Sequence, residues 1–182
     1  MSKRTLAYLV LKSAVLFLSL LCFYPLSATN PQKKEMKELN VKKVSLANVA
    51  VENVPALLDK EKVDFQSINT VNWKAFPYQP EVQFRIAHTD DAILIHYKVK
   101  EASVRAVATG DNGAVWEDAC VEFFSVPAGD GIYYNVECNC VGTLLIGAGG
   151  GRSNREHAPQ EVMDKVQRWS SLGRESFEER VG

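Results

Sequence analysis

Hydrophobic and polar residues alternate with a period of two over much of the chain, which is typical of strands with one buried face. The clearest case is 82–99, where two alternating runs flank the turn Thr89-Asp90-Asp91 and predict a β-hairpin. A second hairpin is predicted from 121–126 and 132–141, which are joined by a Pro- and Gly-containing turn. Further extended segments are predicted at 41–51, 68–73, 103–108 and 143–146.

The alternation breaks near the C-terminus, where apolar residues fall at helical spacing. Val162, Met163, Val166 and Trp169 predict a short helical insertion near 159–168. The chain then ends in a charged segment without a recognisable final strand, which suggests a sandwich that lacks part of its second sheet. Short strands with turn signals between them predict an all-β fold, an antiparallel β-sandwich that includes this helical insertion.

The first 28 residues have the three-part form of a secretory signal. Lys3 and Arg4 give a positive start, Ser13–Tyr24 is almost wholly apolar, and Ala28 offers a small residue at the cleavage site. The apolar core is short for a membrane span, although an uncleaved anchor stays open as an alternative, and a lipoprotein signal at Cys22 is a weaker one. We therefore expect a signal peptide (1–28), a flexible leader (29–44) and one domain (45–182), exported to the periplasm, the cell surface or the medium.

Charge and cysteine content narrow the classes of partner. The formal net charge of -1 gives no reason to expect nucleic acid, and the glycine run 147–151 lacks the Lys-Ser/Thr of a nucleotide-binding loop.

After signal cleavage the cysteines are Cys120, Cys138 and Cys140. If Glu122, Glu137 and Asn139 line one common surface, Cys120 faces away from the other two cysteines, so the expected state is three small buried thiols without a disulfide.

The stretch 111–125, DNGAVWEDACVEFFS, combines a turn, an aromatic ring and a strand that carries an acid. If 120–124 is extended, Val121 and Phe123 point to one face of the strand, and Cys120, Glu122 and Phe124 point to the other. A carboxylate in mid-strand needs a partner, and a nearby ring with an acid suits a sugar, whose hydroxyl groups and C–H face need both. The alternative is structural: Trp116 covers the core and Glu122 meets a basic neighbour.

Several segments together resemble family 9 carbohydrate-binding modules and their bacterial relatives, a branch of the DOMON-like β-sandwiches. The likeness covers about 45–182, and its most specific part is the Trp-x-Asp-x-x-Val-Glu-Phe-Phe run at 116–124. The other segments that carry it are 71–73, 80–88, 111–113, 134–139, 142–144, 155–157 and 168–173.

This resemblance implies a jelly-roll-like sandwich that binds sugars, often at the reducing end of a chain, between two Trp rings. Trp116 matches the first ring and Trp169 is the candidate for the second, although its spacing also fits core packing. Glu122 matches the strand acid of the family. On the neighbouring strand, family binders carry a basic residue and an Asn two apart; here Asn139 fits, but Glu137 stands in the basic position. Arg155 is the candidate for the missing cation, with Arg85 and Arg168 as alternatives.

Metal binding enters only through the family, because some members hold structural calcium. Asp111, Asp118 and Asp130 have suitable oxygen chemistry, but no spacing here matches a known calcium loop. Trp73 is predicted to pack in the core. No catalytic residue is assigned and no nucleotide is expected.

The main hypothesis is an exported, non-catalytic domain that binds poly- or oligosaccharide in carbohydrate catabolism, with a cell-envelope or glycosidase partner. Three alternatives stay open. Glu122 and Glu137 on neighbouring strands could form the acid pair of a glycoside hydrolase; some DOMON-like sandwiches bind haem; and an envelope module would bind no small ligand.

Overall fold

The computed structural model describes residues 4–12, 38–46 and 49–181. Strands dominate, with two short α-helices and two 3-10 turns. In chain order the elements are β1 (Arg4–Lys12), β2 (Lys42–Lys43), η1 (Val51–Asn53), α1 (Val54–Lys60), β3 (Gln66–Ile68), β4 (Glu81–His88), β5 (Ala92–Lys100), β6 (Ser103–Ala106), η2 (Val115–Glu117), β7 (Cys120–Ser125), β8 (Tyr133–Asn139), β9 (Leu144–Gly149), β10 (Glu156–His157), α2 (Gln160–Met163), β11 (Val166–Ser170) and β12 (Phe177–Val181).

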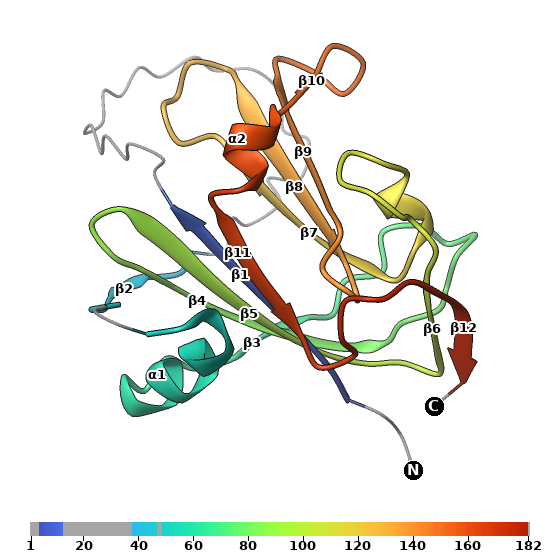
Figure 1. The fold of residues 1–182 in the computed structure, drawn as a ribbon, viewed down its shortest axis with the longest axis horizontal. Coiled ribbons are helices and arrows are strands. Elements are labelled where there is room, and N and C mark those ends of the chain that lie inside the picture. Colours follow the sequence, from blue (N-terminus) through green and yellow to red (C-terminus); the bar gives the residue numbers. More distant parts are fainter. Residues whose placement is uncertain (1–3, 13–37, 47–48, 182) are drawn as a thin grey trace, which may run out of the picture.

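Two sheets face each other, which confirms the predicted all-β sandwich (Figure 1). The first sheet has the order β11-β1-β5-β4-β2, with β3 also paired to β4, and the second has the order β10-β9-β8-β7. The pairs are antiparallel except for the short parallel contact of β2 with β4. A separate pair joins β6 to β12, so the charged C-terminal segment forms a strand that the sequence pattern did not predict.

Both predicted hairpins are present. In the first, β4 and β5 pair from Glu81↔Lys100 to His88↔Ile93, and in the second, β7 and β8 pair from Cys120↔Asn139 to Ser125↔Tyr134. The turn of the second hairpin places Gly129 and Gly131 at φ values of 67° and 81°. Residues with side chains avoid that region, which explains the glycines there.

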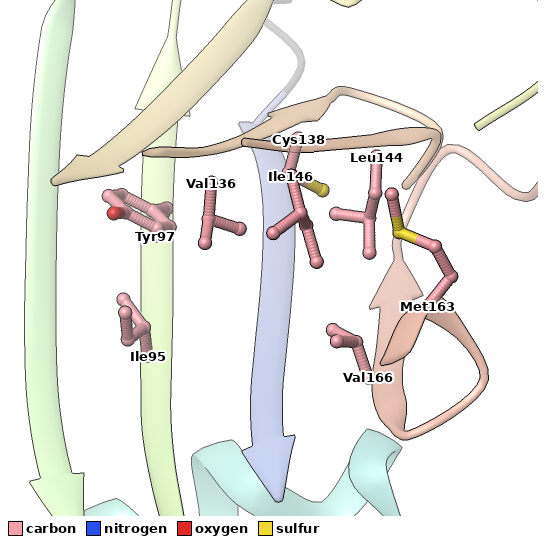
Figure 2. Packing of buried hydrophobic residues seen from close by; sticks show 8 residues of the cluster. All are labelled: Ile95, Tyr97, Val136, Cys138, Leu144, Ile146, Met163 and Val166. Atoms are coloured by element: carbon pink, nitrogen blue, oxygen red, sulfur yellow. The ribbon is translucent and has the colours of Figure 1, made fainter. Parts of the chain in front are cut away.

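The core lies between the sheets, where side chains of both inner faces point toward one another (Figure 2). Val136, Cys138, Leu144 and Ile146 come from the second sheet; Ile95, Tyr97 and Val166 come from the first; and Met163 comes from α2. Val121 and Phe123, which alternation places on one face of their strand, pack against this cluster, so that face is the inner one.

A smaller core lies on the outer face of the first sheet, under α1. Pro55 sits in the first turn of this helix, where a missing N–H costs nothing. Val54 and Leu58 pack on Ala87 and Leu94 with no exposed area. Hydrogen bonds also join this helix to the sheet. Arg85 of β4 donates to Asp59 (2.6 Å) and to the carbonyl of Pro55 (2.9 Å), both in α1, and to Nδ1 of His96 on β5 (3.0 Å).

The predicted helical insertion is confirmed but is shorter than expected. Helix α2 covers only Gln160–Met163, and β11 begins at Val166. The helix predicted from the spacing of Val162, Met163 and Val166 is therefore wrong beyond its first turn. Pairing in the sheet overrides so short an apolar pattern. Strand β9 likewise extends to Gly149, into the glycine run that was expected to be a loop.

The structure describes two segments within the predicted signal peptide and leader, namely 4–12 and 38–44. Arg4–Lys12, within the predicted signal, is β1 between β5 and β11, and 13–28 lie outside the described residues. Strand β2 and the buried Val44 fall within the predicted leader, so the folded part reaches further toward the N-terminus than residue 45. In the described part of the chain no helix has the length and apolarity to cross a membrane. Signal cleavage and export remain predictions.

Cys120, Cys138 and Cys140 are free thiols; Cys138 and Cys140 are buried, whereas Cys120, expected to be buried, is half-buried. Cys120 lies opposite Asn139 on the outer face of the second sheet, whereas Cys138 belongs to the core. Burial raises the pKa of each of these thiols to about 12. They therefore stay protonated at neutral pH and have little nucleophilic character.

Candidate functional site

The outer face of the second sheet carries a row of polar side chains on two neighbouring strands. On β8 the alternation places Asn135, Glu137 and Asn139 on this face, because Val136 and Cys138 between them belong to the core. The register sets Glu122 of β7 directly opposite Glu137. Side chains that face each other in this way have Cβ atoms about 5 Å apart, so two carboxylates are neighbours here.

Glu137 and Asn135 are buried, with relative exposures of 5% and 0%. Asn135 Nδ2 donates to Glu137 Oε1 at 2.6 Å. The other carboxylate oxygen of Glu137, Oε2, and the amide oxygen of Asn135, Oδ1, are buried without a hydrogen-bond partner. Such acceptors are costly to leave unpaired, so this face is short of hydrogen-bond donors.

Two arginines approach this face from the loop between β9 and β10. The Cβ and Cδ atoms of Arg155 lie over Gly147, the residue of β9 that pairs with Asn135, and its guanidinium lies 5.8 Å from the ring centre of Tyr133. Burial and the Glu137 carboxylate raise the pKa of Glu122, while the charges of Arg155 and Arg152 act in the opposite direction. The structure therefore brings Glu122, Glu137 and Arg155 together.

Asn139 lies on the same face, but its side chain is fully used by the protein. Its Oδ1 accepts from the amides of Val141 (3.2 Å) and Thr143 (2.7 Å), and its Nδ2 donates to Asp118 at 2.9 Å. Asp118 also accepts from the amides of Val107 and Ala108. Asn139 was predicted to contact a ligand. In the structure its hydrogen bonds instead hold the β8–β9 turn and the segment before β7 in place.

Trp116 is exposed at the end of the second sheet where Asn139 lies. It belongs to η2, just before β7, and 56% of its surface is accessible. The neighbouring Val115 is fully buried and anchors this turn. The alternative in which Trp116 covers the core does not hold, because its ring is open to solvent.

Trp169 lies elsewhere. It belongs to β11 in the first sheet, and alternation turns it away from the inward-facing Val166. Trp169 and Glu122 thus lie on opposite outer faces of the sandwich, and the structure does not bring the two predicted Trp rings together over one site.

The other candidate cations are occupied by ion pairs. Arg85 is buried under α1 and pairs with the exposed Asp59 of that helix. Arg168 makes a bidentate pair with Asp111, with Nη1–Oδ1 and Nη2–Oδ2 distances of 2.8 and 2.6 Å. Of the three arginines considered from the sequence, Arg155 is the one beside Glu122.

A pocket of about 370 Å³ opens along the free edge of β7, between the two sheets. Glu122 and Phe124 line it from β7, and Val82, Tyr97 and Glu101 line it from the hairpin β4–β5 and the residues after it. Tyr97 donates its hydroxyl to the carbonyl of Glu122 at 3.3 Å. Burial raises the pKa of the Glu101 carboxyl at this pocket.

The aspartates considered for calcium do not fit a shared site. Asp111 is held by Arg168 and by the amide of Leu144, Asp118 by three protein donors, and Asp130 by the amide of Ile132 in the turn. Within the described ranges, no group of three or more His, Cys, Asp or Glu side chains is arranged to hold a metal ion.

Sequence reasoning missed three features of this region. Asn135 could have been found from the Asn-x-Glu-x-Asn alternation of β8, and Arg152 only from its position three residues before Arg155. Trp73 was assigned to the core, but 70% of its surface is exposed. The Pro-containing segment around it, which cannot continue a strand, was a signal for an exposed loop.

Comparisons with known proteins agree with this architecture. The model of carbohydrate-binding family 9 matches residues 52–182. A crystal structure from Bacteroides uniformis ATCC 8492, named a "putative carbohydrate-binding protein", is 60% identical in sequence with a TM-score of 0.75. The match covers 79% of this chain and 66% of that protein. No curated protein matches the chain. The chain therefore belongs to carbohydrate-binding family 9, and this membership supports a carbohydrate as its partner.

Proposed function

We propose that the chain is an exported, non-catalytic domain that binds a poly- or oligosaccharide on the outer face of its second sheet, in the breakdown of carbohydrate. The observation that carries this site is the pair of buried acceptors without donors, Glu137 Oε2 and Asn135 Oδ1, beside the carboxylate of Glu122. Both acceptors are buried and Glu122 is exposed, so a sugar hydroxyl group that reaches past Glu122 can supply the donor that they lack.

The roles follow from position and chemistry. Glu122 and Glu137 accept charge-assisted hydrogen bonds from adjacent hydroxyl groups. Arg155 donates to a ring or hydroxyl oxygen and offsets part of the negative charge. Trp116 offers its exposed ring to the C–H face of a sugar. In this assignment Asn139 positions the turn and does not touch the ligand, and Trp169 plays no part.

Isothermal titration of the 182-residue chain with cello-, xylo- and manno-oligosaccharides tests the proposal. We expect saturable heat with at least one series, and a loss of roughly tenfold or more in affinity in Glu137→Gln and in Trp116→Ala. Glu161→Gln, an exposed acid on α2, is the matched control and should bind as the wild type does. Unchanged binding in both site variants would move the site elsewhere, and no heat with any series would favour an envelope module without a small ligand.

Export has its own test. The protein recovered from the periplasm, the cell surface or the medium should have the mass of a chain that begins at Thr29 and so lacks β1. A product that retains residues 1–28 in these fractions would favour an uncleaved anchor, and recovery from the cytoplasm alone would contradict export.

The cross-strand pairing of Glu122 and Glu137 makes a glycoside hydrolase the second candidate, because retaining enzymes hold two carboxyl groups about 5 Å apart. Release of reducing ends by the wild type, absent in both Glu122→Gln and Glu137→Gln, would establish it. Binding without turnover would support the non-catalytic domain.

A further inference from the structure

The loop between β3 and β4 exposes three aromatic side chains within six residues. The relative exposures are 70% for Trp73, 74% for Phe76 and 60% for Tyr78. Single exposed apolar residues are ordinary, but a group of large rings in one loop is typical of a binding surface. Lys74 is the one charged residue of segment 69–80, which also contains the amides Asn69, Asn72 and Gln79.

Hydrogen bonds fix this loop on the sandwich. The amide of Phe76 donates to the carbonyl of Trp73 at 3.0 Å, and Gln79 Nε2 donates to the carbonyl of Asn69 at 2.9 Å, which closes the loop. The hydroxyl of Tyr78 accepts from the amide of Ala102 at 3.0 Å. The rings are thus presented by a braced segment, which lowers the entropic cost of binding.

The loop adjoins the pocket at the edge of β7. Ile68 and Pro80, at the two ends of the loop, line this pocket together with Glu122 and Phe124. Glu101, another lining residue, precedes the amide that Tyr78 holds. A surface therefore continues from the proposed sugar contact at Glu122, through the pocket, to the base of the aromatic loop.

We propose that the pocket and the aromatic loop 69–80 form an extension of the site that binds further sugar units of one uncharged polysaccharide chain. Exposed rings stack on the C–H faces of sugar rings, amides bond to hydroxyl groups, and the low charge of the loop favours a neutral ligand. This inference rests on the proposed function, because the extension prolongs a site that begins at Glu122.

The test is the dependence of affinity on ligand length, measured by titration of the 182-residue chain with the di- and hexasaccharide of each neutral series. We expect the hexasaccharide to bind roughly tenfold or more tightly than the disaccharide. In the double variant Trp73→Ala/Phe76→Ala this advantage should disappear, while disaccharide affinity stays unchanged. Lys74→Ala, in the same loop, is the control and should keep the advantage.

The outcomes separate this inference from the proposed function. Equal affinity for both lengths in the wild type, or a length advantage that survives in the double variant, overturns the extension and leaves the site at Glu122 intact. No binding of either length removes both. Light scattering adds one more arm: a wild-type dimer that the double variant converts to monomer would assign the loop to contacts between copies and overturn the proposal. Because the substituted rings are exposed, we expect the thermal unfolding of the variant to match that of the wild type.

Discussion

Replacement of Asn139 by alanine separates a structural role from a ligand-binding role. The substitution removes an acceptor from the amides of Val141 and Thr143 and a donor from Asp118. Asn139 is fully buried and Val141 is 1% exposed, so water cannot readily replace the lost partner at Val141.

The expected loss can be estimated from these groups. A buried polar group without a partner costs about 1–3 kcal/mol, and a hydrogen bond to a charged group contributes about 1.5–3 kcal/mol. Water can reach the amide of the half-buried Thr143, and the contributions within one network are not additive. We therefore expect Asn139→Ala to lower the free energy of unfolding by about 3–5 kcal/mol, a large part of the ~5–15 kcal/mol that holds a domain together.

Urea and thermal unfolding measure this effect. For a chain of this length each kcal/mol corresponds to about 2–4 °C, so the Tm should fall by about 6–20 °C. Asn72→Ala, in the exposed loop, is the control and should stay within about 0.5 kcal/mol of the wild type. A Tm within about 2 °C of the wild type, with sugar binding abolished, would refute the structural assignment and return Asn139 to the ligand.

Three further predictions concern protons. Burial lowers the pKa of His96 to about 3. Its contribution to the free energy of unfolding should therefore be fully present above pH 6.5 and fall by up to about 1.4 kcal/mol per pH unit below that pH. Urea titrations of His96→Gln should lack this slope, and an equal slope in the variant would contradict the prediction. Burial acts to raise the pKa of Asp111, but hydrogen bonds from Arg168 and the Leu144 amide outweigh it and hold that pKa below its ordinary value. Its stabilisation is therefore present above pH 3.8 and lost as the pH falls through the lower folded value, and acid unfolding of Asp111→Asn should lack this component. In Glu137→Gln, loss of the neighbouring charge should move the raised pKa of Glu122 back toward its ordinary value, and an NMR titration that finds it unmoved would show that the two carboxylates do not interact.

The fold was largely predictable because its main signal is local. Alternation and turn residues identified both hairpins, and the facing of Val121 and Phe123 opposite to Glu122 followed from the period of two. The pairing of β6 with β12 was not predictable, since the charged segment 177–181 shows no alternation and becomes a strand only where β6 offers an edge. Strand β11 was hidden because Val166 and Trp169 continue the apolar helical spacing of α2, although the two residues face opposite sides of the strand.

The site was predictable in part for a similar reason. The facing of Glu122 and Glu137 follows from alternation and hairpin register, both of which the sequence contains. The placement of Trp169 in the other sheet depends on long-range pairing, and the use of Asn139 inside a turn depends on amides that no spacing rule identifies. The exposed loop around Trp73, by contrast, was signalled by its prolines, although its apolar residues favoured the core.

The position of β1 has a consequence for the timing of folding. Ala7 pairs with Ser170, and Leu9 pairs with Ile95. At a synthesis rate of about 5–20 residues per second, roughly 8–30 s separate the appearance of β1 from that of its partner β11. Throughout that interval residues 4–12 cannot take their place in the finished sheet. Since β5 ends at Lys100, β1 can pair with it early, but its second edge stays open until β11 at the end of the fold has been synthesised.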